Sequence, residues 1–197
     1  MTLLLKLSKL IDWLNERVGK GAFWLILIMA IISAGNASYR FIFDDSSNGM
    51  LEIQWYLFAA VFLLCSPSTL QKNEHVRIDV LSSKFGPRGL AIIDIVGSLF
   101  FLLPMVIMVL WLSIPLVAES YRITEYSANA GGLLRWPVKA LLPLGFALLA
   151  LQGISELIKR IAYLAGMIDD PNSKSHEPTP EEELAAAIAA AKAKEAK

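Results

Sequence analysis

The chain has 197 residues, of which 55% are hydrophobic and 18% charged, and its mean hydropathy is +0.53. Soluble domains carry about 25% charged residues, so this composition favours a membrane protein. A formal net charge of zero speaks against nucleic acid as a partner, and a single cysteine, Cys65, excludes an intrachain disulfide and a thiolate metal centre.

Residues 1–20 are predicted to form an amphipathic helix on the inner membrane surface. A cleaved signal peptide ending near Ala34 to Ala37 is the alternative, and it is disfavoured because the apolar run continues to Phe43. The apolar positions that recur at helical spacing are Leu3, Leu7, Leu10, Ile11, Leu14 and Val18, with Trp13 beside them and Lys6, Lys9 and Arg17 elsewhere on the helix.

Four apolar stretches follow, and each is long enough to cross a bilayer, which takes about 20 residues. We predict an all-α membrane protein with a four-helix transmembrane domain over residues 21–165, because strands would show alternation and an open sheet cannot span lipid. Pro104 and Pro115 predict a kink or tilt in the third span. The four spans are residues 22–43, 51–70, 89–118 and 137–158.

Basic residues predict the topology. They collect before the first span, between spans two and three and after span four, whereas the first connector has two aspartates and no base. The positive-inside rule therefore places both termini in the cytoplasm, and it brings aromatic residues to the outer boundary. The basic residues on the inner side are Lys6, Lys9, Arg17, Lys20, Lys72, Arg77, Lys84, Arg88, Lys159 and Arg160, and the aromatic residues on the outer side are Trp55, Tyr56, Trp111, Tyr121 and Trp136.

Several polar residues lie inside or near the predicted spans, where charge is costly and usually paired. Asp94 is the deepest, and we expect it to pair with a neighbouring base; contact with a partner helix is the other interpretation. Arg40 and Glu52 could form a salt bridge between spans one and two, and Asn36 and Gln152 are expected to form interhelical hydrogen bonds. A stripe of small residues suits close packing, either within the chain or on a partner: Ala30, Ala34 and Ser38.

Residues 166–197 form a linker followed by an alanine-rich segment. Thr179, Pro180 and Glu182 match a helix start with a capping box. The segment lacks an apolar stripe wide enough to require a partner, so we interpret it as a solvated cytoplasmic helix.

The sequence has no signature of catalysis or of a bound cofactor. No phosphate-binding glycine loop, nucleophile elbow or metal-binding histidine pair is present. Haem between two histidines of a four-helix bundle is not supported, because His75 lies in a connector and His176 in the tail. We therefore expect no enzyme, no cofactor, no metal and no catalytic residue.

The connector between spans two and three has an unusual pattern, in which polar residues alternate with apolar ones from Asn73 to Leu81. Together with the run from Glu52 to Phe58, which contains Trp55, this connector resembles the signature of the DctQ family, the small membrane subunits of tripartite ATP-independent periplasmic (TRAP) transporters. The similarity covers about residues 3–163. The polar residues of the connector pattern are Glu74, His75, Arg77 and Asp79.

The resemblance implies a scaffold that carries no substrate itself. In such transporters a periplasmic binding protein captures a substrate, usually an organic acid, and a large, DctM-like membrane subunit moves it inward by an elevator motion driven by a sodium gradient. The small subunit would anchor the large one in the lipid of the bacterial inner membrane. Its outer connectors, residues 44–50 and 119–136, would face the binding protein, and the motif residues would serve assembly.

Two other functions remain open from the sequence alone. One is the membrane anchor of a redox or signalling complex, which a haem absorbance band would favour. The other is a small autonomous carrier that works as a dimer, which transport by the isolated chain would favour.

Overall fold

The computed structural model describes residues 2–45, 47–73 and 86–169. The predicted all-α fold is confirmed, and four of its helical stretches are long and apolar enough to cross a membrane. In the described part of the chain the extended pairing is limited to one bridge, between Tyr126 and Leu134. The elements are α1 (Thr2–Phe43), α2 (Asn48–Gln71), α4 (Pro87–Gly97), the π-helical turn η1 (Ser98–Leu102), α5 (Leu103–Arg122) and α6 (Trp136–Leu164).

The first helix is longer than the predicted first span. No break separates residues 2–20 from the apolar residues after them, although Gly19 and Gly21 both lower helix propensity. Gly19 instead permits close packing against α2, since a Cβ added there would lie 2.9 Å from Ser68 Cβ. The predicted surface helix and the predicted first span are thus two halves of one helix. The place of the first half on the membrane surface stays a prediction.

The predicted distortion of the third span occurs at Pro104. Proline has no N–H and its ring crowds the carbonyl four residues earlier, so an α-helical bond is lost there. The chain responds just before the proline with the π-helical turn η1, in which the Leu103 N–H donates to the Ser98 carbonyl five residues back. Around Pro115, by contrast, α5 continues as α-helix.

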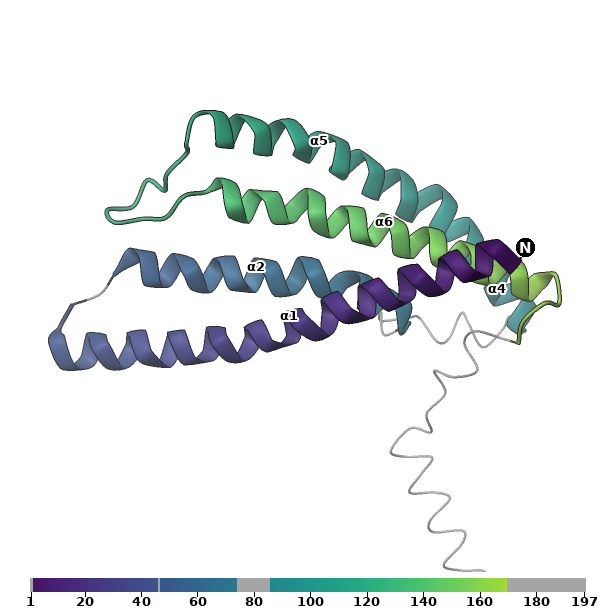
Figure 1. Ribbon diagram of the computed structural model, residues 1–197, viewed down its shortest axis with the longest axis horizontal. Coiled ribbons are helices and arrows are strands. Elements are labelled where there is room, and N and C mark those ends of the chain that lie inside the picture. The colour runs from purple at the N-terminus through teal and green to yellow at the C-terminus, as the bar shows by residue number, and fades with distance from the viewer. Residues whose placement is uncertain (1, 46, 74–85, 170–197) are drawn as a thin grey trace, which may run out of the picture.

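The long helices form an open layer rather than a closed bundle. They lie in the order α1, α2, α6, α5, and each of these neighbouring pairs is in contact (Figure 1). The N-terminal half of α1 crosses to reach α6 at the end of the molecule where α4 also packs on α6. Apart from α4 and the crossing half of α1, no described element covers the broad faces of the layer.

The interior of this layer is more polar than its surface. Among the described residues, ten polar or charged side chains are buried, against Pro67 and seven other apolar ones, and four of those seven are alanines. Large apolar side chains point outward instead, as with Phe41, which is 88% exposed, and Trp111, which is 75% exposed. In a bilayer the hydrophobic effect does not drive helices together, so small residues and interhelical hydrogen bonds supply the contacts.

The N-terminal half of α1 follows the same rule. Its leucines face outward, and Leu3 and Leu10 are 77% and 61% exposed, while Ser8 and Asn15 are almost fully buried. The small-residue stripe formed by Ala30, Ala34 and Ser38 is also exposed, so it does not pack within the chain.

Candidate functional site

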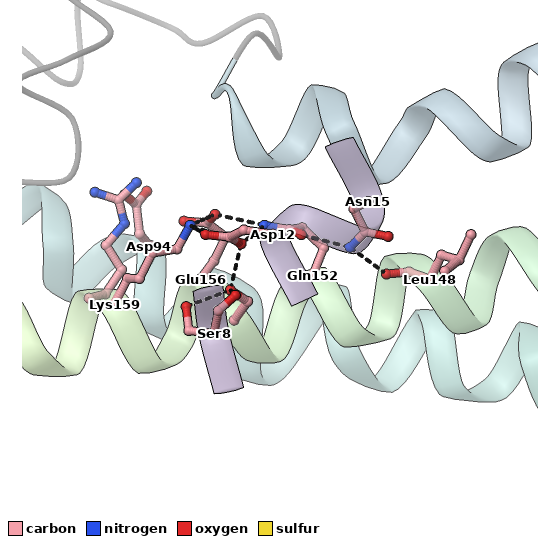
Figure 2. Close-up of polar contacts among 10 residues, drawn as sticks. Ser8, Asp12, Asn15, Asp94, Leu148, Gln152, Glu156 and Lys159 are labelled. Carbon is pink, nitrogen blue, oxygen red and sulfur yellow. Dashed lines mark hydrogen bonds and ion pairs between the residues drawn. The ribbon is translucent and has the colours of Figure 1, made fainter. Parts of the chain in front are cut away.

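Two polar clusters organise the molecule, one at each end. The first, which we call the α1–α6 network, joins the N-terminal half of α1 to α6 (Figure 2). Its side chains lie three or four residues apart on each helix, so each set occupies a single helix face. The network consists of Ser8, Asp12 and Asn15 from α1 and Gln152, Ser155, Glu156 and Lys159 from α6.

Gln152 is the centre of the network and has no exposed surface. Its carbonyl oxygen accepts a hydrogen bond from Asn15 Nδ2 at 2.7 Å. Its amide nitrogen donates to Asp12 Oδ1 at 2.9 Å and to Glu156 Oε1 at 3.1 Å. The amide group is therefore saturated by partners on both helices, which fixes its orientation. The expectation that Gln152 forms interhelical hydrogen bonds agrees with these contacts.

Charged groups complete the network. Lys159 Nζ lies 3.2 Å from Asp12 Oδ2 and also forms an ion pair with Glu156. The Ser155 hydroxyl lies 2.7 Å from both Asp12 Oδ1 and the Ser8 hydroxyl. One ammonium group thus serves two carboxylates, and Asp12 Oδ1 also accepts from the Gln152 amide and the Ser155 hydroxyl. Such an arrangement fixes the register of α1 on α6.

Asp94 lies beside this network on α4. Its carboxylate forms an ion pair with Arg160 of α6, with Nη2 and Oδ2 separated by 3.4 Å. The Arg160 side chain is 6% exposed. Pairing of Asp94 with a base agrees with the first of the two interpretations from the sequence, and it ties α4 to the same part of α6.

The second cluster, which we call the Glu52 cluster, lies near the N-terminal end of α2. The Glu52 carboxylate accepts hydrogen bonds from the Ser127 hydroxyl, from Asn129 Nδ2 at 2.9 Å and from the Leu133 backbone N–H at 2.8 Å. All three donors belong to the connector between α5 and α6. The expected salt bridge from Arg40 to Glu52 is wrong: no ion pair joins these two side chains, and Arg40 is exposed. The connector's donors satisfy the carboxylate instead.

The connector between α5 and α6 (residues 123–135) has a defined shape of its own. The Ser127 N–H donates to the Leu133 carbonyl at 2.9 Å, and the Arg135 N–H donates to the Glu125 carbonyl at 2.8 Å. These bonds make a narrow hairpin whose tip turns at Gly131, where φ is +70°.

Two side chains of α2 also hold this connector. The Tyr56 hydroxyl donates to the Leu134 carbonyl at 3.1 Å, and Asn48 Nδ2 donates to the Ala130 carbonyl at 3.0 Å. Together with Glu52, they attach the connector to the start of α2 along its length.

Glu125 anchors the base of the connector to α6. Its carboxylate forms an ion pair with Lys139, and Arg135 lies nearby, with Nη1 3.8 Å from Oε1. The hydrogen bond from Lys139 is the main cause that lowers the pKa of Glu125 below its ordinary value, and the charge of Arg135 adds to the effect. The carboxylate is thus held in its ionised form.

An open apolar groove of about 370 Å³ lies between the adjoining ends of α5 and α6. Tyr121 and Trp136 meet edge to face at its rim, with ring centroids 5.4 Å apart. Its walls offer no charged side chain that could bind an organic acid. The groove is lined by Ile114, Val117, Ala118, Tyr121, Trp136, Ala140 and Pro143.

The remaining predicted residues are scattered. Asn36 is buried on α1, and Trp55 is 69% exposed on α2. Neither residue belongs to one of the two clusters. Within the described chain the structure therefore brings Gln152 and Asp94 near one another at one end and places Glu52 at the other. Four residues of the family pattern lie outside the described residues: Glu74, His75, Arg77 and Asp79.

Sequence reasoning missed most of the α1–α6 network. The sequence pattern gave no role to Asp12 or Asn15, and Lys159 counted only as a basic residue of the inner side. A usable signal lies on the face opposite the leucines of the first segment. Small or polar residues recur there with alternating steps of three and four, at positions 8, 12, 15, 19 and 22 of α1 and 152, 155, 159 and 162 of α6.

Comparison with known proteins gives one match. The family of tripartite ATP-independent periplasmic transporters, DctQ component, matches over residues 11–162, which include α1 from Ile11 onward and nearly all of α6. Neither the curated proteins nor the solved structures gave a match. The matched region covers most of the chain and all four helices that are long and apolar enough to span a membrane. The chain therefore belongs to the DctQ family and is the small membrane component of a TRAP transporter.

Proposed function

We propose that this chain is the scaffold subunit that anchors the large, DctM-like membrane subunit of its transporter in the inner membrane. The observation that carries the proposal is the open layer of four helices, whose broad faces expose large apolar side chains. A closed bundle would bury its own helix faces. An open layer leaves wide apolar surfaces for lipid and for a second membrane protein.

The polar clusters support a rigid rather than a moving role. The α1–α6 network joins residues that are more than 130 positions apart in the chain, through buried hydrogen bonds and ion pairs. Interhelical hydrogen bonds in membranes contribute about 0.6 kcal/mol each on average, with a maximum of about 1.7 kcal/mol. A set of them on one helix pair resists sliding, and an immobile frame is what an elevator-type subunit requires.

The proposed orientation places both termini in the cytoplasm. The lysines and arginines toward the start of α1 and the end of α6 support it, as do the exposed Trp55 in the N-terminal half of α2 and Tyr121 in the last turn of α5. In this orientation the Glu52 cluster and the connector between α5 and α6 face the periplasm. The soluble binding protein would approach from that side.

The transported substrate and the driving force are proposed from family membership. We infer import of an organic acid that the binding protein delivers, with a sodium gradient as the energy source. The apolar lining of the groove between α5 and α6 is consistent with substrate translocation by another subunit.

Co-purification and uptake test the proposal together. The chain is co-expressed with the large subunit, and the complex is reconstituted into proteoliposomes with an inward sodium gradient and the purified binding protein. An organic acid that stabilises the binding protein in a thermal-shift screen serves as the radiolabelled substrate. We expect a stable complex, and uptake that requires both membrane subunits and the binding protein.

Two outcomes would contradict the proposal. Uptake by the large subunit alone at the full rate would remove the need for a scaffold. Transport by the isolated small subunit in liposomes would show that it is a carrier itself. Liposomes with an equal sodium concentration on both sides are the control for the driving force.

A further inference from the structure

Glu52 carries a buried carboxylate in an apolar part of the molecule. It lies in the second turn of α2, in a stretch apolar enough to span a membrane, and is 5% exposed. A charge in such a position is costly unless hydrogen bonds satisfy it. Its side-chain partners, Ser127, Asn129 and the Leu133 N–H, all belong to the connector between α5 and α6. The buried charge therefore shapes a connector instead of joining two helices.

The start of α2 also contacts the tip of the connector between α5 and α6. Asn48 at the start of α2 donates to the Ala130 carbonyl, and a Cβ added to Gly49 would lie 3.1 Å from the Gly131 carbonyl oxygen. The start of α2 thus lies against the tip of the connector between α5 and α6, and the exposed Asp44 and Asp45 come just before α2 in the chain. Away from α2 the connector exposes an uncharged tip and Tyr126, which is 62% exposed.

Connectors on protein surfaces are usually mobile, and ordering them on binding costs free energy. A connector that is already held in shape loses less conformational entropy when a partner docks, so its affinity is higher. The hydrogen bonds of Glu52, Tyr56 and Asn48 hold residues 123–135 in this way before any partner arrives. Holding the connector adds no contact between membrane-spanning helices, so a role in binding explains it better than a role in helix packing.

We propose that Glu52 is a positioning residue for docking of the soluble binding protein, and that its carboxylate holds the connector between α5 and α6 in the shape which that partner contacts. The inference rests on the proposed function and deepens it. The partner surface would place polar or aromatic side chains against the uncharged tip around Tyr126. It would place basic side chains opposite Asp44 and Asp45, whose charges are exposed.

Replacing Glu52 tests the inference in the reconstituted complex. For Glu52→Ala we expect an unchanged yield of complex with the large subunit and an unchanged maximal uptake rate. The half-saturating concentration of binding protein should rise about tenfold, which is the effect of about 1.4 kcal/mol. Hydrogen exchange of residues 123–135 should quicken at the same time. Glu52→Gln should show a smaller rise, because one oxygen still accepts while the amide nitrogen opposes the connector's donors.

Glu119→Gln is the matched control. Glu119 lies at the same end but in the last turn of α5, outside residues 123–135, and its side chain pairs with the exposed Arg122. Loss of one negative charge there should leave both the half-saturating concentration and the exchange rates unchanged. Asp44→Asn combined with Asp45→Asn should instead raise the half-saturating concentration and weaken its dependence on salt, without quickening exchange.

Three results would overturn the inference. Glu52→Ala that no longer co-purifies with the large subunit would make Glu52 an assembly residue. Faster hydrogen exchange of the connector with an unchanged half-saturating concentration of binding protein would show that docking does not depend on the connector's shape. Unchanged exchange would show that Glu52 does not hold it. Failure of the proposed function looks different, because the complex with wild-type Glu52 would then show no uptake that depends on the binding protein.

Discussion

Both polar clusters depend on hydrogen bonds to buried carboxylates, but they stabilise different parts of the structure. In the α1–α6 network, side-chain carboxylates and amides form hydrogen bonds between two helices. The partners on the two helices are 133–147 residues apart in the sequence. In the Glu52 cluster, a carboxylate of one helix bonds to a connector, including a backbone N–H. The first arrangement fixes how helices lie on each other, and the second fixes the shape of a segment outside them. In an open layer with few buried apolar side chains, polar contacts take over both tasks.

Loss of Lys159 should have the largest effect. Lys159→Met leaves the carboxylates of Asp12 and Glu156 facing each other without their shared cation. Breaking a largely buried charge network in this way should cost about 3 kcal/mol in the free energy of unfolding. An SDS titration of the detergent-solubilised protein measures it. If the network alone sets helix register, exchange should quicken in α1 and α6 and remain unchanged in residues 123–135.

Lys20→Met is the control for this change. Lys20 pairs with Glu16 one turn away, and both side chains are exposed, so the pair should contribute little to stability. A double variant in which Asp12→Asn accompanies Lys159→Met should recover part of the loss. Equal losses for Lys159→Met and Lys20→Met would contradict a special role for the network.

Gly145→Ala tests whether the two ends are independent. Gly145 lies on α6 between the clusters, and a Cβ there would lie 2.8 Å from Leu63 Cβ and 3.0 Å from the Leu63 carbonyl oxygen of α2. Because backbone cannot yield easily, the two helices must separate, and overpacking of this kind costs about 2 kcal/mol. Hydrogen exchange should then quicken in both clusters, since α2 carries Glu52 and α6 carries half of the α1–α6 network. Gly35→Ala has nothing within 4 Å of the added Cβ and should not destabilise.

How much of this arrangement the sequence predicts depends on the range of the contact. The spans follow from apolar run length, and the distortion before Pro104 follows from the missing N–H. Asp94 and Gln152 could be recognised because an isolated polar group in an apolar helix needs a partner. Each of these signals lies within a single helix and can be recognised from its sequence alone.

The partners themselves could not be predicted. Asp12 and Lys159 lie in segments that already contain other charges, so their burial depends on how α1 crosses α6. Glu52 was assigned to Arg40 because the two flank one short connector. The real donors, including Ser127 and Asn129, lie 75 and 77 residues further on and form a hairpin whose fold no periodicity reveals.

Tyr56→Phe should act only at the connector. It removes the hydrogen bond from the tyrosine hydroxyl to the Leu134 carbonyl while keeping the ring. One such bond contributes about 1 kcal/mol. We expect faster exchange in residues 123–135 and a nearly unchanged midpoint of global unfolding. Tyr163→Phe, at the opposite end of α6, should leave connector exchange unchanged; a drop in global stability as large as that of Lys159→Met would remove the distinction between the two ends.

Acid should have the smallest effect, a modest destabilisation of the connector between α5 and α6. Because Lys139 lowers the pKa of Glu125 in the folded chain, the ionised carboxylate stabilises the fold at pH values above its ordinary pKa. That stability is lost as the pH falls below the ordinary pKa of a glutamate and through the lowered pKa of Glu125. Exchange of residues 123–135 should therefore quicken over that range, and Glu125→Gln should remove this part of the pH dependence. The α1–α6 network does not contain Glu125, so the same substitution should leave the acid response of α1 and α6 unchanged, and a matching change at both ends would mean that the clusters titrate as one unit.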